Sequence, residues 1–200
     1  MLVQLGKNAR KAAARLGTAG IEEKNHALLA VADALEQQKE YLLEENQKDI
    51  KNAKESGMTE ALIDRLALTE ARIEGMSEGI RQVAALEDPI GEVMNMKKRP
   101  NGLLIGQKRV PLGVIGIIYE SRPNVTADAF SLCFKTGNAV ILRGGSDAIY
   151  SNTAITSVIR STLKDCGMTA DAIQLVTDTS RETATKLMQL NDYIDVLIPR

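Results

Sequence analysis

The sequence is poor in the side chains that stack on nucleic-acid bases or hold metal ions. It has no tryptophan, an aromatic content of 3% and a single histidine, His26. So few aromatic rings argue against a surface that binds single strands by base stacking. No second histidine, cysteine or paired carboxylate stands near His26 in the sequence, so we interpret it as a solvated structural residue and expect no metal site.

The sequence also lacks a charge imbalance, long apolar runs and a cysteine framework. Its formal net charge of −1 gives no electrostatic reason to expect binding to nucleic acid or to an anionic membrane. No apolar run approaches the ~20 residues of a membrane span, and no charged-then-apolar signal segment opens the chain. Two cysteines without a secretion signal predict reduced thiols and a cytoplasmic location.

Two short apolar runs, at 114–119 and 139–142, dominate the middle of the chain. Both are rich in β-branched residues, and the segment between them is amphipathic and about as long as a helix. This order is typical of a β-α-β unit, whose parallel strands need a long crossover. Because the runs are apolar throughout rather than alternating, we expect helices to cover the strands on both faces.

Most of the unusual residues follow these two strands. In an open α/β sheet a ligand binds at the carboxyl edge, which is where both loops would lie. Arg143 offers a fork of donors suited to phosphate, and the two glycines after it permit positive φ and close approach of a ligand. We expect Ser146 or Asp147 to cap the next helix, whose amino end would also favour an anion. The loop residues are Glu120, Ser121, Arg122, Pro123 and Asn124 in the first, and Arg143, Gly144, Gly145, Ser146 and Asp147 in the second.

The residues alone leave a simpler interpretation open, in which the second loop is an ordinary Gly-Gly turn and Arg143 is a solvated surface charge. The dinucleotide fingerprint G-x-G-x-x-G is absent. Gly113 and Gly116 lie three apart in the first strand region and indicate close packing rather than a phosphate loop.

Residues 1–90 predict helices, and residues 91–110 predict a β-hairpin around Asn101-Gly102. The second helix carries an apolar stripe that includes Ile21 and Leu29, and an interruption is expected near Thr69. In residues 111–200 two further strand patterns, at 173–176 and 194–198, follow the β-α-β unit. We therefore predict an α/β fold, with a helical amino-terminal region and a doubly wound parallel, Rossmann-like sheet. A capping box of Thr179 and Glu182 is expected to open the last helix.

Three runs carry a resemblance to a known family: SRPNVT at 121–126, GNAVILRGGS at 137–146 and DVLIPR at 195–200. They resemble the γ-glutamyl phosphate reductases of the aldehyde dehydrogenase superfamily, as does MTEALIDRL at 58–66, and the likeness extends over essentially all 200 residues. It implies an aldehyde dehydrogenase-like fold and the second step of proline biosynthesis. In that step NADPH reduces γ-glutamyl phosphate (L-glutamate 5-phosphate) to L-glutamate 5-semialdehyde, and phosphate is released.

The resemblance also implies roles for residues. Arg143 occupies the position of a lysine that contacts the adenosine ribose in other aldehyde dehydrogenases. Ser146 occupies the position of a glutamate that binds the ribose hydroxyls in NAD-specific members. Because a glutamate would repel the 2′-phosphate and a serine beside an arginine accepts it, NADPH/NADP is the expected cofactor. Asn124 is the candidate for the oxyanion-binding asparagine. Its spacing to Asn138 is about one helical turn shorter than usual in the superfamily, which leaves Arg122 as an alternative suited to a phosphorylated substrate. The expected cofactor-binding residues are Ser121, Arg122, Pro123, Arg143, Gly144, Gly145 and Ser146.

The nucleophilic cysteine of the superfamily is not expected in this chain. Cys133 lies inside the crossover helix and Cys166 at a helix end, and both positions are typical of packing. The chain therefore resembles the cofactor-binding half, truncated before the catalytic domain, and would be inactive alone. In the superfamily the hairpin projects toward a neighbouring subunit, so we expect a homo-oligomer; a glutamate kinase, fused in bifunctional synthases, is a further partner that the resemblance allows.

Three alternatives to this functional interpretation and its residue roles stay open. One is another NADP-dependent aldehyde dehydrogenase, against which SRPN and RGGS count. A second is a noncatalytic nucleotide-binding or assembly module that keeps the fold without the thiol. The third concerns Arg122, which could simply pair with Glu120 across the loop. Continuation of the reading frame beyond Arg200 into a cysteine-bearing domain would separate the reductase from the module.

Overall fold

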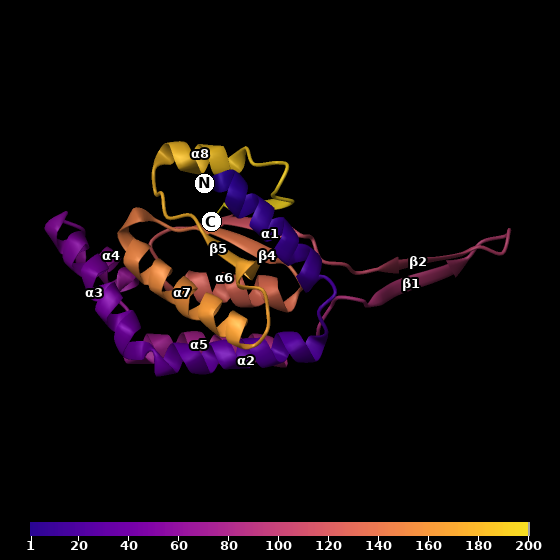
Figure 1. Cartoon of the computed structure of the whole chain (residues 1–200), viewed down its shortest axis with the longest axis horizontal. Helices are drawn as coiled ribbons and strands as arrows, with labels where there is room; N and C mark the ends of the chain where they lie inside the picture. The colour runs from indigo at the N-terminus through magenta and orange to yellow at the C-terminus, as the bar shows by residue number, and fades with distance from the viewer. Residues whose placement is uncertain (200) are drawn as a thin grey trace.

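Four parallel strands form the centre of the computed structural model, which describes residues 1–199 (Figure 1). In the spatial order β5-β4-β3-β6 they are Ile173–Leu175, Ala139–Arg143, Val114–Ile118 and Val196–Pro199. The chain lays down β3 and β4 first, adds β5 beyond β4, and then crosses back to place β6 on the other side of β3. This reversal makes the sheet doubly wound, which confirms the predicted architecture.

Helices cover both faces of the sheet. The crossover helices α6 and α7 lie on one face, with α2 and α5 behind them, while α1 lies against the opposite face beside α8 (Figure 1). No helix within residues 1–199 is both long and apolar enough to cross a membrane. The helices are α1 (Leu2–Leu16), α2 (Ile21–Gln37), α3 (Lys39–Glu55), α4 (Glu60–Leu66), α5 (Glu70–Ala85), α6 (Asn124–Lys135), α7 (Ile149–Asp165) and α8 (Arg181–Met188), with 3-10 turns η1 (Ser146–Ala148) and η2 (Ala170–Ala172).

The core follows from the apolar strands. Val114, Ile141 and their neighbours on β3 and β4 are buried on both faces, as uniformly apolar strands require. On α6 the rings of Phe130 and Phe134 are fully buried with centroids 5.1 Å apart. Each such side chain contributes about 1.5–3 kcal/mol by leaving water, so this packing fixes α6 on the sheet.

The helix predictions were partly confirmed and partly wrong. The break near Thr69 is confirmed, because its hydroxyl accepts a hydrogen bond from the backbone N–H of Arg72 and caps α5. Ile21 and Leu29 were expected in the apolar stripe of α2, but they are 40% and 45% exposed. Ile21 lies in the first turn of the helix, and Leu29 lies at the edge of the stripe that packs against the core. The last helix is capped by Ser180, whose hydroxyl accepts from the backbone N–H of Thr183, and not by Thr179.

Two buried lysines, one on α2 and one on the crossover helix α6, hold the end of the helical region in place. Lys24 of α2 is 2% exposed and forms an ion pair with Asp88, just before the hairpin. Lys135 of α6 is equally buried and donates to the side-chain oxygen of Asn25 (2.7 Å) and to the carbonyl of Ala84 (2.8 Å). The stem of the hairpin is thereby fixed to the body.

The hairpin consists of β1 (Val93–Lys98) and β2 (Leu104–Lys108), paired antiparallel and projecting from the body (Figure 1). The predicted turn is confirmed, with Gly102 at a φ of +86°. Opposite and alternate positions place Met96 and Leu104 on one face of the hairpin and Asn95 and Gln107 on the other.

Gly113 fills a position that no other residue fits, at the entry to β3. Its φ is +118°, and a Cβ there would lie 2.2 Å from a carboxylate oxygen of Asp195. That carboxylate accepts from the backbone N–H of Val114 (2.8 Å) and from Arg10 of α1 (2.6 Å). The close packing expected at Gly113 and Gly116 is confirmed, since a Cβ on Gly116 would meet Leu197 at 2.9 Å.

We expect Gly113→Ala to lower the free energy of unfolding by about 2–4 kcal/mol, because it adds backbone strain and displaces Asp195. Gly75→Ala is the matched control, since a Cβ on this exposed residue of α5 meets nothing within 4 Å. It should raise stability by about 0.5–1 kcal/mol through helix propensity. Urea unfolding measures both, and equal effects would contradict the packing described for Gly113.

Candidate functional site

A cavity of about 540 Å³ lies at the carboxyl edge of β3 and β4; we name it the cofactor cavity. It gathers both loops that the sequence singled out, as expected for neighbouring parallel strands. The predicted residues that line it are Ser121, Arg122, Arg143, Gly145 and Ser146. Its other lining residues are Met58, Leu62, Arg65, Ile118, Tyr119, Glu120, Asp147, Thr179 and Arg181.

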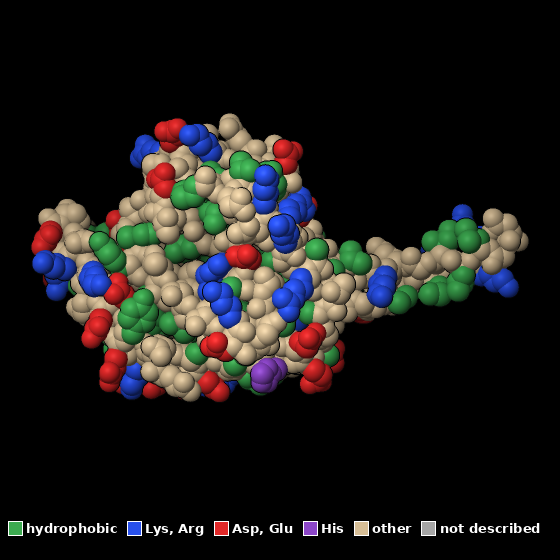
Figure 2. All heavy atoms as spheres, in the orientation of Figure 1, with side chains coloured by type: hydrophobic (Ala, Val, Ile, Leu, Met, Phe, Trp, Pro, Cys, Tyr) green, Lys and Arg blue, Asp and Glu red, His purple; other side chains and the backbone are tan. Residues whose placement is uncertain are grey.

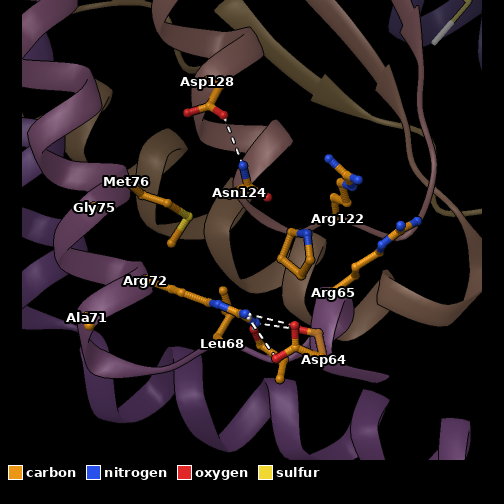
Figure 3. A pocket seen from close by; sticks show the side chains of 12 residues that line it. Asp64, Arg65, Leu68, Ala71, Arg72, Gly75, Met76, Arg122, Asn124 and Asp128 are labelled. Atoms are coloured by element: carbon orange, nitrogen blue, oxygen red, sulfur yellow. Dashed lines mark hydrogen bonds and ion pairs between the residues drawn. The ribbon is translucent and has the colours of Figure 1, made fainter. Parts of the chain in front are cut away.

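The remaining predicted residues lie elsewhere. Pro123 and Asn124 line a second cavity of about 610 Å³, which we name the helical cavity because α4 and α5 form one of its sides (Figure 3). Arg65 and Arg122 line both cavities, so the two adjoin. Gly144, in the loop after β4, is buried and lines neither cavity.

The positive φ expected at the two glycines was wrong. Gly144 and Gly145 are not among the glycines with positive φ. A Cβ on Gly144 would lie 2.3 Å from the amide nitrogen of Asn152, and a Cβ on Gly145 would lie 2.6 Å from the hydroxyl of Ser121. Both glycines are therefore needed for packing between this loop and its neighbours.

Arg143 is half-buried and spans two strand ends. Its Nη2 donates to the carbonyl of Thr179 (2.5 Å), in the segment between β5 and α8. Its Nε is buried and has no hydrogen-bond partner among residues 1–199. Arg143 is therefore not the freely solvated surface charge of the simpler interpretation, and it lines the cofactor cavity with a donor that has no partner within residues 1–199.

The expected cap of the helix after β4 was also wrong. Neither Ser146 nor Asp147 caps η1 or α7; the hydroxyls of Ser121 and Ser146 donate to Asp147 instead (2.9 and 3.3 Å). The N–H groups of Tyr150 and Ser151 at the start of α7 donate to the carboxylate of Asp49 (3.2 and 2.8 Å). Because a protein carboxylate already occupies this helix terminus, it does not attract a ligand anion.

Asp49 belongs to a polar clamp on α3 that includes Asn46, one turn earlier. The Asn46 side chain donates to the carbonyl of Leu66 (2.9 Å), at the end of α4, and accepts from the backbone N–H of Leu68 (2.8 Å). It also donates to the hydroxyl of Ser151 (2.9 Å), which in turn donates to Asp49 (2.6 Å). The clamp thus holds the end of α4 beside the start of α7, and with it Arg65.

Asn124 is exposed at the start of α6, and its amide donates to the carboxylate of Asp128 (3.1 Å). Arg122 forms no ion pair with Glu120 within residues 1–199; only its backbone N–H contacts that residue, through the Glu120 carbonyl (2.8 Å). The alternative of a Glu120–Arg122 side-chain pair across the loop is therefore wrong.

The cysteines match their structural interpretation. Cys133 is buried within α6, and desolvation raises the pKa of its thiol to about 12. Desolvation also raises the pKa of Cys166, with a smaller effect of Asp165 in the same direction. Because the thiolate is the nucleophilic form, neither residue has the setting of a catalytic thiol.

Sequence reasoning missed three residues near the site: Asp49, Arg65 and Arg181. Arg65 lies in the MTEALIDRL run, which had counted only toward the resemblance. Asp49 looks like one of many charged residues on α3, and only its 1% exposure sets it apart. Arg181 follows the loop at the carboxyl end of β5, and this position in the sequence could have identified it as a residue near the site.

Comparison with known proteins adds to this geometry. A profile of the aldehyde dehydrogenase family matches residues 4–197. The chain is 60% identical, over its whole length, to the γ-glutamyl phosphate reductase of Lachnospira eligens, of which it covers 48%. The crystal structure of γ-glutamyl phosphate reductase from Thermotoga maritima matches all of this chain with a TM-score of 0.97 and 42% identity, over 48% of that protein. The corresponding yeast structure, from Saccharomyces cerevisiae, matches 98% of this chain with a TM-score of 0.90 and 34% identity, over 50% of its own length. The chain spans about half the length of these relatives.

We expect Asp49→Ala to lower the free energy of unfolding by about 2–4 kcal/mol, because it leaves two N–H groups of α7 and the Ser151 hydroxyl without their acceptor. Glu45→Ala, on the preceding turn of the same helix, removes an acid whose one ion pair within residues 1–199 is with the exposed Lys48, and it should change stability by less than about 1 kcal/mol. Urea unfolding at neutral pH tests both variants, and a small loss for Asp49→Ala would contradict the clamp.

The pH dependence of this effect has a definite sign. Desolvation raises the pKa of the Asp49 carboxyl, against the opposing hydrogen bonds from Ser151 and Tyr150. The folded protein therefore holds this proton to a higher pH than the unfolded chain, so the stability that Asp49 contributes falls as pH rises through the raised pKa. We expect the stability advantage of the wild type over Asp49→Asn to be larger at about pH 4 than at about pH 7. An advantage that grew with pH would mean that the pKa is lowered.

Proposed function

The chain belongs to the aldehyde dehydrogenase family, and from that premise we propose that it is the cofactor-binding half of a γ-glutamyl phosphate reductase. The complete protein would reduce L-glutamate 5-phosphate with NADPH to L-glutamate 5-semialdehyde and release phosphate, the second step of proline biosynthesis, in the cytoplasm. The observation that carries the proposal is 60% identity across the whole chain to a relative of that name. The SRPNVT and GNAVILRGGS runs at the site support it.

We assign three parts to this half. Residues 1–90 would be the helical part of the cofactor-binding domain, residues 91–110 the hairpin, and residues 111–200 the Rossmann-like part that precedes a catalytic domain. The first and third parts share one hydrophobic core, in which Leu28 and Leu35 of α2 belong to the same cluster as Phe130 of α6. The helical part therefore supports the sheet rather than forming a separate unit.

The family implies a nicotinamide cofactor, which accepts or donates a hydride when bound. The cofactor cavity fits it, because the buried Nε of Arg143 has no partner within residues 1–199 and lies at the carboxyl edge of the sheet. Four arginines against two carboxylates line this cavity, which favours a phosphorylated ligand. Arg143, Ser146 and Arg181 would hold the 2′-phosphate of NADPH, with no carboxylate in the place of Ser146 to repel it.

The chemical step would need residues from both halves. The nucleophilic cysteine would come from the part of the protein beyond this chain. Asn124 would direct a side-chain N–H at the oxygen on which negative charge develops, because its amide group has two N–H donors and gives one of them to Asp128. Ser121, Arg122 and Pro123 would shape the passage between the cofactor and the substrate.

The proposed assembly is a homo-oligomer formed through the hairpin. Apolar side chains cover part of the projecting hairpin (Figure 2), and Met96 and Leu104 are 55% and 59% exposed. Exposed apolar side chains gathered on a projecting hairpin usually belong to an interface. A fused glutamate kinase would be a further partner of the complete protein.

The function is tested by assaying the complete protein in the reverse direction. We expect reduction of NADP⁺ that requires both glutamate 5-semialdehyde and inorganic phosphate, and none from the 200-residue chain alone. Semialdehyde oxidation that needs no phosphate would favour another aldehyde dehydrogenase. Cofactor binding without any oxidation would favour a noncatalytic module.

We expect Ser146→Glu to weaken NADPH binding about 10- to 100-fold, because its carboxylate would repel the 2′-phosphate, while NADH binding changes little. Arg143→Glu should weaken NADPH binding at least as much, and Ser146→Ala is the control of unchanged charge. Fluorescence titration of the complete protein measures these affinities. Wild-type NADPH affinity in both charged variants would show that our assignment of this loop is wrong.

We expect the double substitution Met96→Lys with Leu104→Lys to lower the molecular mass in solution, because it replaces the two exposed apolar side chains on one face of the hairpin by charges. Asn95→Lys with Gln107→Lys puts the same charges on the opposite face and should leave the mass unchanged. Light scattering coupled to size exclusion measures the mass of the complete protein. Equal masses for the two double variants would remove this face from the interface.

A further inference from the structure

We infer that Arg65 and Arg122 together bind the phosphoryl group of the acyl phosphate substrate. The inference rests on the proposed function, because that function supplies the acyl phosphate. It adds Arg65, a residue of the helical region, to the substrate site. Both side chains line the cofactor cavity and the helical cavity, so they stand where the two adjoin.

The acids of the helical cavity are already engaged. Asp64 precedes Arg65 in sequence, yet both of its carboxylate oxygens accept from Nη2 of Arg72 (3.1 and 3.2 Å). Asp128 accepts from the amide of Asn124. In Figure 3 dashed lines join these two pairs, whereas none reaches Arg65 or Arg122.

The acids of the cofactor cavity form no ion pair with the same two guanidinium groups in the part of the chain that the structure describes. Asp147 accepts from the hydroxyls of Ser121 and Ser146. Glu120 is exposed and forms no ion pair with Arg65 or Arg122 within residues 1–199. Among the arginines around both cavities, Arg72 is held by Asp64 and Arg143 by Thr179, and Arg181 lies on the side of α8. On the side of α4, Arg65 and Arg122 therefore remain without an ion-pair partner within residues 1–199.

Two guanidinium groups that share a cavity edge without a counter-ion repel each other, and a bound anion removes that repulsion. A phosphoryl group suits them best, because its oxygens accept paired hydrogen bonds from each planar fork. Both residues are exposed, so a soluble ligand can reach them. The clamp on α3 holds the end of α4 in place, which sets Arg65 near this position before a ligand arrives.

The position distinguishes this site from the cofactor phosphates. Arg122 begins the turn that leads to Asn124, whereas Arg143 and Arg181 belong to the opposite side, at β4 and α8. A substrate whose acyl carbon lies near Asn124 would place its phosphoryl group between Arg65 and Arg122. There the two charges would stabilise the phosphate that takes the bonding electron pair as the C–O bond breaks and the cysteine sulfur bonds to the acyl carbon.

The test uses the complete protein in the reverse direction, with inorganic phosphate as the varied substrate. We expect Arg65→Gln and Arg122→Gln each to raise the KM for phosphate about 10- to 100-fold and to leave the KM for NADP⁺ within twofold of the wild type. Arg65→Lys keeps the charge but not the fork, so its KM for phosphate should be intermediate. Lys7→Gln removes one exposed positive charge from α1 and should leave both constants unchanged.

The outcomes separate the two proposals. A wild type without phosphate-dependent oxidation overturns the proposed function and, with it, the ligand named here. An active wild type whose Arg65→Gln variant keeps the wild-type KM for phosphate overturns only this inference, as does a rise in the KM for NADP⁺ instead. As a readout independent of turnover, inorganic phosphate should raise the Tm of the wild type and of Lys7→Gln but not that of Arg65→Gln. If Arg65→Gln does not fold, Arg65→Lys decides by the same criteria.

Discussion

The candidate site depends on the polar clamp that Asn46 and Asp49 form on α3. Their side chains bind the carbonyl at the end of α4, the N–H of Leu68 and the first N–H groups of α7. Helix termini leave such groups without partners inside the helix, and burying them unpaired would cost several kcal/mol. Supplying them from a third helix fixes two termini at once, so the helical region and the sheet meet in one defined arrangement around the cavities.

One consequence concerns how the site attracts anions. A free helix terminus would attract phosphate through its N–H groups, but Asp49 already occupies the terminus of α7. The positive character of the cofactor cavity therefore comes from arginine side chains contributed by four different segments. Guanidinium groups on separate elements can serve different phosphates, and this separation underlies the distinction drawn between the cofactor side and the substrate side.

The sequence predicted the main architecture because its signals are local. Uniformly apolar β-branched runs, an Asn-Gly turn and a change to helical spacing identify elements from neighbouring residues alone, and β3, β4 and the hairpin appear as predicted. Boundaries and caps were less predictable. Ser180 and Thr179 are both favoured cap residues by type, so the sequence alone did not select between neighbouring positions. At the start of α7, the carboxylate of Asp49, about 100 residues away in the chain, accepts the hydrogen bonds that Ser146 or Asp147 was expected to accept.

The sequence by itself determined the doubly wound sheet, the two loops at its carboxyl edge, and the arginine and serine that follow β4. Periodicity, turn chemistry and the rule that parallel strands end at one edge are sufficient for these. Only the tertiary structure decided that Gly144 and Gly145 are packing residues, that Asp49 caps α7, and that Arg65 lies beside Arg122 without an ion-pair partner among residues 1–199. Each of these depends on contacts between segments that are distant in the sequence. Local sequence patterns do not show which charged side chains form ion pairs or hydrogen bonds in the folded protein.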